Sequence, residues 1–346
     1  MKLNAQKLGQ DILKVVQLMA RTQWTHKPDI AALAKYPVLT REGLRNIKMQ
    51  KGLSTVKTSG STGEPVSVEK SYADIVWYHA ATIREFIWNQ WDLTKTIAII
   101  NPKAQEIEST NWNLPRWLNP NQGKAYYHGI APISKLQKWL EEKNPHYISA
   151  FPSIIAQLDL TEIPNFIAAR GTGEVGGTVY STQECGVIAI NCPHNPDMMH
   201  VMENIIIETE EDGSALITCQ SNPYIKRYKH GDHIELGTCT CGRTLQAIKK
   251  VKGRVRNMLI TPDGDKKWPV IGSKEYFDKF KIKKYQAVQT ALDEIELRII
   301  APQLGKKEQE LEELVQKSLE EKIKVSIKYV EDFPNYKHEE FVCLVK

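Results

Sequence analysis

The pattern of apolar and polar positions predicts alternating helices and strands in the first part of the chain. Residues 6–20 and 72–91 carry apolar side chains at the spacing of a helix, and the second stretch is rich in tryptophan. Residues 96–100 and 147–150 are short apolar runs, which are typical of buried strands. With a further helix over 134–143, this order of elements predicts an α/β layer architecture.

The ends of helix 134–143 carry recognisable signals. Ser134 is a residue type that accepts hydrogen bonds from the first turn of a helix, so we expect it to be the N-cap. Asn144 and Pro145 follow the last apolar position, and this pair predicts that the helix ends there.

The later part of the chain has a different pattern of apolar and polar residues. Residues 204–209 and 214–218 alternate like strands around a turn at 211–213. After residue 254 the pattern predicts strands over 257–261, 284–290, 294–300 and 324–330, with helices over 274–280 and 308–322. We therefore expect an N-terminal α/β domain over 1–254 and a small α+β domain over 255–346.

One loop has the composition of a phosphate-binding loop. It lies between predicted strands 53–57 and 66–69, which makes it the tip of a hairpin. Glycines allow an anion to approach the backbone closely, and hydroxyls and N–H groups then surround it. The Gly-Lys-Ser/Thr ending of a P-loop is absent, and a polar surface turn is the alternative interpretation. The loop consists of Thr58, Ser59, Gly60, Ser61, Thr62, Gly63, Glu64 and Pro65.

Composition places few limits on function. The chain has 346 residues, 41% of them hydrophobic and 25% charged, which is ordinary for a globular protein. The net charge of +5 permits anionic ligands, but no stripe of Lys and Arg with interleaved aromatic residues indicates nucleic-acid binding. We find no apolar run of membrane-spanning length and no signal-peptide core, so the expected location is the cytoplasm.

Four residues form a candidate zinc site. In a cytoplasmic protein, cysteines are more often thiols or metal ligands than disulfides, and zinc prefers thiolate and imidazole ligands. Four protein ligands leave no open position, so the ion would be structural. His194 is a weaker candidate for the histidine ligand, and unrelated packing thiols are the alternative interpretation, as we expect for Cys185, Cys219 and Cys343. The four candidates are Cys192, His200, Cys239 and Cys241.

Six motifs occur in an order that matches a known family. They are the 58–65 loop, 151–153 (Phe-Pro-Ser), 180–186 (Tyr-Ser-Thr-Gln-Glu-Cys-Gly), 225–232 (Ile-Lys-Arg-Tyr-Lys-His-Gly-Asp), 239–243 (Cys-Thr-Cys-Gly-Arg) and 252–254 (Lys-Gly-Arg). With them, most of the chain resembles the phenylacetate–CoA ligase and coenzyme F390 synthetase branch of the adenylate-forming (AMP-binding) enzymes.

The resemblance implies a role for each matching residue. The 58–65 loop would hold the β- and γ-phosphates of ATP, and Glu184 would bind Mg²⁺. Tyr180 would stack on adenine, whose pocket Gly173 and Glu174 would line, and Asp232 would bind the ribose hydroxyls. Further implied residues are Arg243 and Arg254 in the phosphate and hinge region and the catalytic Lys337 on a mobile C-terminal domain.

The same resemblance implies a two-step reaction. ATP and a carboxylic acid would give an acyl-adenylate and pyrophosphate, and a thiol of CoA or a carrier protein, or an amine, would then take the acyl group. One hypothesis is that Trp77, Tyr78, Trp88 and Trp91 line a pocket for an aromatic acid. A homodimer is a further expectation.

Three departures from the family pattern motivate a second hypothesis. Arg256 and Asn257 replace an aspartate pair, Gln183 replaces a hydroxyl residue, and only residues 175–179 separate Glu174 from Tyr180. The alternative function is therefore a degenerate homologue that binds nucleotide or acyl-adenylate without turnover, as a partner subunit. A basic zinc protein that binds nucleic acid is a third and weaker interpretation.

Overall fold

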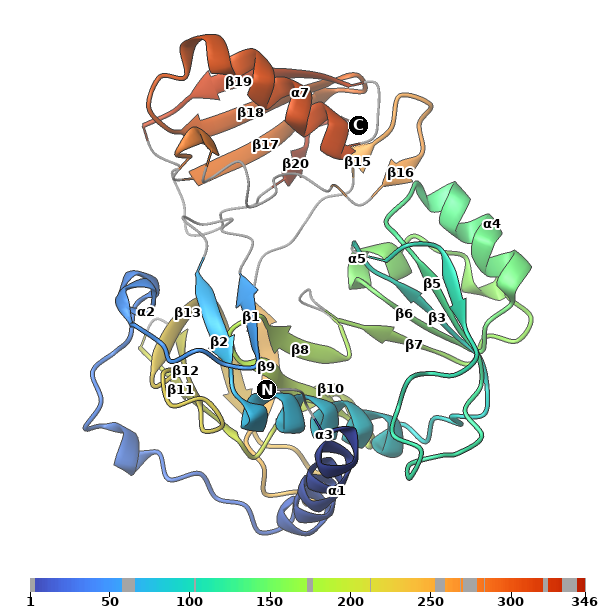
Figure 1. The fold of residues 1–346 in the computed structure, drawn as a ribbon, viewed down its shortest axis with the longest axis vertical. Coiled ribbons are helices and arrows are strands. Elements are labelled where there is room, and N and C mark those ends of the chain that lie inside the picture. Colours follow the sequence, from blue (N-terminus) through green and yellow to red (C-terminus); the bar gives the residue numbers. More distant parts are fainter. Residues whose placement is uncertain are drawn as a thin grey trace.

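The computed structural model describes most of the chain. The described residues are 4–57, 66–102, 104–172, 177–211, 213–252, 259–267, 269, 279–282, 284–319, 323–331 and 341–345. Within them, helices and strands form several sheets in the layered α/β arrangement that the sequence predicts, so the predicted fold class is confirmed (Figure 1).

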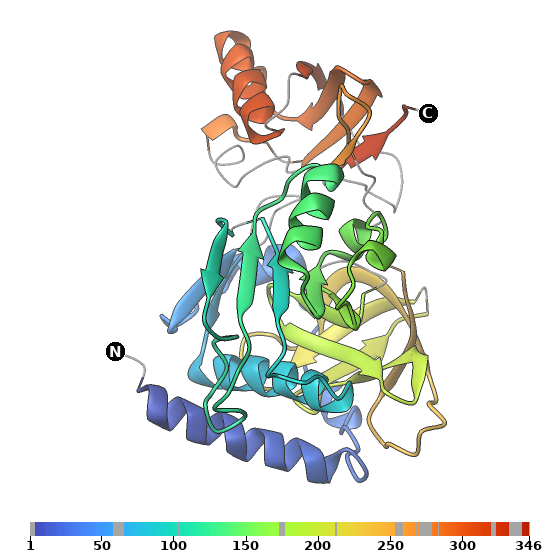
Figure 2. The ribbon, with the colours of Figure 1, turned by 90° about the vertical axis from the view of Figure 1, so that its right-hand side faces the viewer.

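The first helices wrap around the N-terminal part of the molecule. The side chain of Asn4 caps α1 by accepting from the N–H of Lys7 at 3.0 Å, and α1 packs along α3 (Figure 2). A capping box of Ser71 and Asp74 starts α3. The bounds are α1 Ala5–Thr22, η1 Ala31–Leu33, α2 Arg41–Asn46 and α3 Tyr72–Trp88.

A five-stranded sheet contains the predicted strands 96–100 and 147–150. Its order is β4-β5-β3-β6-β7, and all neighbours are parallel except β4 with β5. The strands are β3 Ile97–Ile100, β4 Ile107–Ser109, β5 Ala125–His128, β6 Tyr147–Ala150 and β7 Ala168–Gly171. The helices beside it are α4 Ile133–Lys143, α5 Pro152–Ile155 and η2 Leu160–Glu162.

Helix α4 corrects the predicted cap. It begins at Ile133 with Pro132 as its N-cap residue, which has no capping side chain. Instead, Asp265 of the C-terminal part accepts from the backbone N–H of Ser134 at 3.0 Å and from its hydroxyl. The capping acceptor of α4 is therefore the Asp265 carboxylate from another segment, and Ser134 is a donor to it rather than the N-cap residue. The predicted end is confirmed, because Asn144 adopts a left-handed conformation with φ of 45°.

A seven-stranded antiparallel sheet contributes most of the largest hydrophobic core. Its order is β11-β12-β13-β14-β10-β9-β8, and its inner side chains join α1 and α3 in the largest hydrophobic core. The predicted turn between β11 and β12 contains Gly213, with φ of +82°. The strands are β8 Val179–Thr182, β9 Gly186–Cys192, β10 Asn195–Val201, β11 Ile205–Thr209, β12 Ser214–Cys219, β13 Tyr228–Gly237 and β14 Ala247–Lys252.

The C-terminal part has its own sheet and its own core. The order β19-β18-β17-β20 is covered by α7, whose Leu311, Val315 and Leu319 are buried against the strands. A separate two-stranded ladder, β15–β16, lies next to α4 (Figure 1). The elements are β15 Leu259–Ile260, β16 Lys266–Lys267, β17 Lys284–Ala291, β18 Glu294–Ile300, η3 Gly305–Lys307, α7 Glu308–Leu319, β19 Lys324–Tyr329 and β20 Phe341–Cys343.

No helix in the described part of the chain is both long enough and apolar enough to span a membrane.

Candidate functional site

The predicted phosphate loop is carried by a hairpin, as expected. Strands β1 Ser54–Lys57 and β2 Ser67–Lys70 pair antiparallel, and Lys57 lies opposite Ser67. Loop residues 58–65 join these strand ends but lie outside the described residues, so their phosphate-binding role stays a prediction. The base of the hairpin is tied to the centre of the molecule, because Lys70 Nζ donates to the backbone oxygen of Glu184 at 2.6 Å.

Glu184 is a buried carboxylate between β8 and β9. Its side chain is 3% exposed. The hydroxyl of Tyr228 donates to its Oε1 at 3.2 Å, and a guanidinium nitrogen of Arg41 lies 3.8 Å from the same oxygen. On the other side, His230 Nε2 lies 3.9 Å from Oε2. One hydrogen bond and two nearby nitrogens therefore hold this buried carboxylate in a defined position.

Asp232 joins the same centre through the same histidine. Its Oδ2 lies 3.1 Å from His230 Nδ1 and accepts a hydrogen bond from the hydroxyl of Tyr180 at 2.9 Å. Burial, followed by the charge of Asp232, raises the pKa of Tyr180 well above its ordinary value, so Tyr180 remains a neutral donor. The structure thus brings together Tyr180, Glu184 and Asp232, three of the residues predicted from the sequence.

The seven-stranded sheet must curl strongly to make these contacts. Strands β8 and β13 are separated by β14, β10 and β9 in the sheet order. In a flat sheet, four steps of about 4.8 Å would place them roughly 19 Å apart. The side chains of Tyr180 and Asp232 are nevertheless hydrogen-bonded, so the sheet curves until its β8 edge faces β13.

Four other predicted residues lie outside the described part of the chain. Gly173 and Glu174 lie in the undescribed segment 173–176, and Arg254 and Lys337 are likewise outside the described ranges. The ends of segment 173–176 are close together, because a Cβ added to Gly177 would lie 2.4 Å from the backbone oxygen of Gly171. Only glycine permits this approach.

The sequence resemblance places Arg243 in the phosphate and hinge region, but in the structure Arg243 lies away from Glu184. Its Nε donates to Gln23 Oε1 at 2.9 Å, and its guanidinium lies 4.4 Å from the ring centroid of Trp88 and 5.0 Å from that of Trp24. Trp88 ends α3, whereas Lys70, which contacts Glu184, precedes the start of that helix. A helix of 17 residues is about 25 Å long, so Arg243 is not a neighbour of Glu184.

The four predicted metal ligands do come together. Their ligand atoms all lie within 4.8 Å of one another. Cys239 Sγ lies 3.7 Å from Cys192 Sγ, and His200 Nε2 lies 3.2 Å from Cys241 Sγ. His194, the weaker candidate, is not part of this group. Three thiols and one imidazole at this spacing are a donor set that can surround one zinc ion.

Electrostatics at the cluster suits metal binding. Burial, followed by the charges of Arg243 and Arg84, lowers the pKa of His200 to about 4, so its imidazole is neutral. Burial opposes ionisation of Cys241, but hydrogen bonds from the backbone and side chain of Arg243 prevail and lower the pKa of that thiol. Arg243 therefore stabilises negative charge on a thiolate ligand.

Two of the tryptophans assigned to an aromatic-acid pocket contact other rings of the protein. Trp91 stacks on Tyr147 with ring centroids 4.3 Å apart, and both belong to a core cluster with Phe86 and Trp112. Trp88 faces His200 at the cysteine cluster. The hypothesis that these rings line an aromatic-acid pocket gains no support from their positions.

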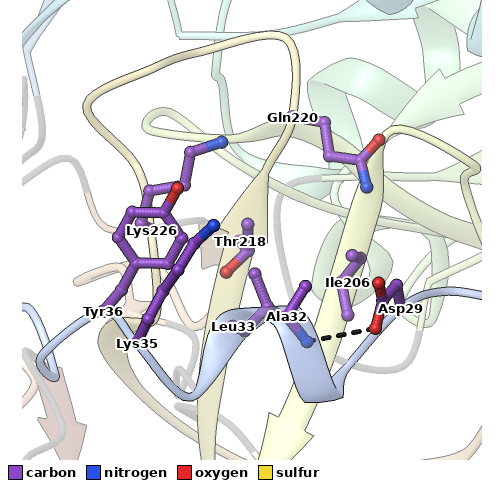
Figure 3. A pocket seen from close by; sticks show the side chains of 9 residues that line it. All are labelled: Asp29, Ala32, Leu33, Lys35, Tyr36, Ile206, Thr218, Gln220 and Lys226. Atoms are coloured by element: carbon purple, nitrogen blue, oxygen red, sulfur yellow. Dashed lines mark hydrogen bonds between the residues drawn. The ribbon is translucent and has the colours of Figure 1, made fainter.

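A surface cavity of about 270 Å³ lies apart from both centres (Figure 3). It is formed by the segment around η1 and by β11 and β12, with Lys35, Tyr36 and Lys226 on one side and Asp29 and Gln220 on the other. Lys226 of the 225–232 motif lines it, but none of the residues to which the sequence resemblance assigns a role does.

Four residues of the acidic centre were not predicted from the sequence. Tyr228 and His230 lie inside the 225–232 motif, so the motif itself was a signal for them. Lys70 and Arg41 come from segments more than one hundred residues away from Glu184, and no sequence pattern marks their contact with it.

Comparison with solved structures identifies proteins with a similar fold. No protein-family model matches the sequence, and no curated protein matches it. Among solved structures, a 2-hydroxyisobutyryl-CoA ligase in complex with 2-HIB-AMP and CoA, in the thioesterification state, aligns with a TM-score of 0.58 and 16% identity, over 99% of this chain and 91% of that chain. Amide bond synthetase McbA from Marinactinospora thermotolerans aligns with a TM-score of 0.44 and 13% identity, over 81% of this chain and 65% of that chain. An o-succinylbenzoate CoA synthetase (MenE) from Bacillus subtilis aligns with a TM-score of 0.46 and 14% identity, over 83% of this chain and 67% of that chain.

The chain therefore has the fold of the adenylate-forming ligases. This result agrees with the superfamily that the six sequence motifs indicate.

Proposed function

We propose that this protein activates a carboxylic acid with ATP, forming an acyl-adenylate and pyrophosphate, and then transfers the acyl group to a thiol or an amine. The observation that carries the proposal is the pair of carboxylates, Glu184 and Asp232, bridged by His230 beside the base of the β1–β2 hairpin. The two carboxylates come from distant motifs of the sequence resemblance, and the adenylate-forming fold supports the same function.

The residues present suit a nucleotide with its divalent cation. Mg²⁺ commonly binds one or two carboxylates, with the remaining positions taken by phosphate oxygens and water, so Glu184 suffices as its protein ligand. When bound, the ion would neutralise charge on the phosphates. Asp232, held by Tyr180 and His230, is suited to accept hydrogen bonds from ribose hydroxyls.

Two further parts of the proposal rest on the sequence resemblance. Lys337 would stabilise the developing charge at the α-phosphate, and a hinge at Arg254 would separate a large domain, 1–254, from a small domain, 255–346. The separate hydrophobic core formed by residues 259–341 supports this division. ATP would be the cosubstrate, and CoA, a carrier protein or an amine would be the acceptor.

We also propose a structural zinc ion at Cys192, His200, Cys239 and Cys241. The support is a set of four donors within 4.8 Å, three of them buried, with a neutral imidazole. Since four protein ligands complete a tetrahedron, this ion would stabilise the fold and take no part in the reaction.

The test is ATP–pyrophosphate exchange with Mg²⁺ across a panel of aryl and aliphatic acids. Exchange that depends on one class of acid would establish adenylation and identify the substrate type. Lys337→Ala should abolish that exchange in a folded protein. Absence of exchange with every acid, from folded protein that binds ATP, would overturn the catalytic proposal and indicate a binding protein.

A further inference from the structure

The surface cavity in Figure 3 lies on the outer face of the seven-stranded sheet. Neighbouring residues of a strand point to opposite faces, and Ile207 and Ile217 belong to the largest hydrophobic core. Ile206 of β11 and Thr218 of β12 therefore point away from that core, yet they are only 2% and 1% exposed. They line the cavity together with residues of the segment 29–36, so this segment covers the outer face of the sheet.

Hydrogen bonds to the backbone hold the covering segment in place. The backbone oxygen of Tyr36 accepts from Arg227 Nη1 at 2.9 Å, and Leu39 donates its N–H to the backbone oxygen of Arg227 at 3.0 Å. At the start of η1, Asp29 Oδ1 accepts from the N–H of Ala32 at 3.0 Å. The segment is therefore tied to the sheet at one end and begins its helical turn in a defined way at the other.

Two lysines and a tyrosine form one side of the cavity. Lys35, Tyr36 and Lys226 lie together there (Figure 3), and Lys35 Nζ lies 5.3 Å from the centroid of the Tyr36 ring. Within the described part of the chain, no carboxylate forms an ion pair with either ammonium group, and the Tyr36 hydroxyl makes no hydrogen bond. This side of the cavity thus offers two positive charges and a hydroxyl to a ligand.

The carboxylate on the same face of β11 already has a partner. Glu208 lies two residues beyond Ile206, so both side chains point to the outer face of the sheet. Arg227 Nε donates to the two carboxylate oxygens of Glu208, at 3.2 and 3.1 Å. Glu208 is therefore engaged by Arg227 and does not neutralise Lys35 or Lys226.

The opposite side of the cavity has a different chemistry. Asp29 and Gln220 lie there (Figure 3), while Leu33 and Ile206 add apolar surface. A carboxylate accepts hydrogen bonds from hydroxyl groups, and an amide both donates and accepts. The cavity volume of about 270 Å³ is close to the lower end of the range of about 300–1,000 Å³ that small-molecule sites span. A matching ligand is therefore small, with negative charge at one end and hydroxyl groups at the other.

We propose that this cavity is a binding site for a small phosphorylated polyol. The phosphate would contact Lys35, Lys226 and the Tyr36 hydroxyl, and the polyol hydroxyls would contact Asp29 and Gln220. A phosphate monoester carries a charge of about −1.5 to −2 at neutral pH, so it matches two ammonium groups better than a single carboxylate does. A second anionic group at the far end would be repelled by Asp29. The inference is independent of the proposed function, because none of the residues that form the acidic centre lines the cavity.

Calorimetry with glycerol 3-phosphate, inorganic phosphate and glycerol tests this assignment. The wild type should bind glycerol 3-phosphate with a Kd of about 1 mM or tighter, inorganic phosphate at least about threefold more weakly, and glycerol not detectably. Lys35→Gln and Lys226→Gln should each weaken glycerol 3-phosphate about fivefold or more, because each removes a charged donor. Lys27→Gln is the matched control: Lys27 is an exposed lysine near the same segment that does not line the cavity, and its variant should stay within about twofold of the wild type.

Four outcomes would overturn the assignment. They are no binding of glycerol 3-phosphate by the wild type, unchanged affinity in both cavity variants, an equal loss in Lys27→Gln, and equal affinity for inorganic phosphate and glycerol 3-phosphate. Unchanged affinity in the cavity variants would mean that the phosphate binds elsewhere, and an equal loss in the control would mean general attraction to a positive surface. Melting temperatures show whether each variant is folded, and if one cavity variant does not fold, the other decides by the same comparison.

Discussion

The two polar centres near opposite ends of α3 are built in different ways. The cysteine cluster contains a complete donor set, because its four ligand atoms lie within 4.8 Å of one another and Arg243 supplies the balancing positive charge. The acidic centre instead holds two carboxylates, Glu184 and Asp232, joined by His230 at distances of 3.1–3.9 Å. The first centre needs only an ion, whereas the second is suited to a ligand that brings further groups.

This difference predicts different consequences of mutation. At a metal site with four protein ligands, the free energy of metal binding stabilises the folded state, so loss of a ligand should lower the free energy of unfolding. Loss of a carboxylate at the acidic centre should remove a proposed contact to the nucleotide and leave the fold largely intact. The predictions below test that distinction, beginning with the largest effect.

Replacement of Cys241 by serine should give the largest change in stability. We expect the bound zinc to fall from about one equivalent to none, and the free energy of unfolding to fall by at least about 3 kcal/mol. Zinc analysis and thermal melts measure both quantities. Cys343→Ser is the control, since Cys343 lies outside the cluster and should leave the zinc content unchanged. A wild-type protein that binds no zinc at neutral pH would contradict the metal site.

Arg84→Met tests the buried ion pair next to the cysteine cluster. Arg84 makes two hydrogen bonds to Glu203 and lies over the ring of Trp88, which in turn faces His200. Removal of the arginine leaves a buried, unpaired carboxylate, which costs about 3–5 kcal/mol. Urea denaturation should show this loss, and the double variant with Glu203→Met should recover most of it. A double variant as unstable as the single one would show that the effect comes from packing.

Asp232→Ala tests the acidic centre by its effect on binding. Tyr180 loses its acceptor, His230 loses the carboxylate beside it, and the proposed contact to the ribose hydroxyls is removed, so AMP and ATP should both bind about tenfold more weakly or worse. Calorimetry with each nucleotide measures the change. Unchanged AMP affinity would remove Asp232 from the nucleotide site.

Asp265→Ala should have the smallest effect, because it touches neither centre. Asp265 caps α4 from the β15–β16 segment, and loss of a helix cap costs about 1 kcal/mol. Amide hydrogen exchange in the first turn of α4 should become roughly fivefold faster, while nucleotide affinity stays the same. Unchanged exchange in that turn would show that the contact does not stabilise the helix in solution.

The sequence predicted the elements whose patterns are local. Helices α1, α3, α4 and α7 and strands β17, β18 and β19 of the C-terminal sheet lie close to the predicted ranges, because apolar periodicity reports the buried face of each element directly. Strand β20 was not predicted. Helix 308–322 is described only as Glu308–Leu319, and 274–280 falls almost entirely on residues outside the described ranges.

Contacts between distant segments were harder to predict. The cap of α4 was assigned to Ser134 because a local signal was present, whereas the acceptor is Asp265, 131 positions away. The sequence resemblance assigns Arg243 to the phosphate and hinge region, but the fold places it on Trp88 and near the cysteine cluster. Arg41 had no signal, since its position depends on backbone pairing of Leu39 with β13.

The most direct test of the account compares Glu184→Gln with Cys241→Ser in one pyrophosphate-exchange experiment. It would use an acid that the wild type accepts, at a temperature where melting curves show both variants folded. We predict that Glu184→Gln loses exchange by about a hundredfold or more with little change in zinc content, because the charged magnesium ligand is gone. Cys241→Ser should lose its zinc yet keep most of the exchange while folded. If Glu184→Gln kept the exchange rate of the wild type, the assignment of the acidic centre to the reaction would be contradicted. If folded Cys241→Ser lost all exchange, the assignment of the cysteine cluster to a purely structural role would be contradicted.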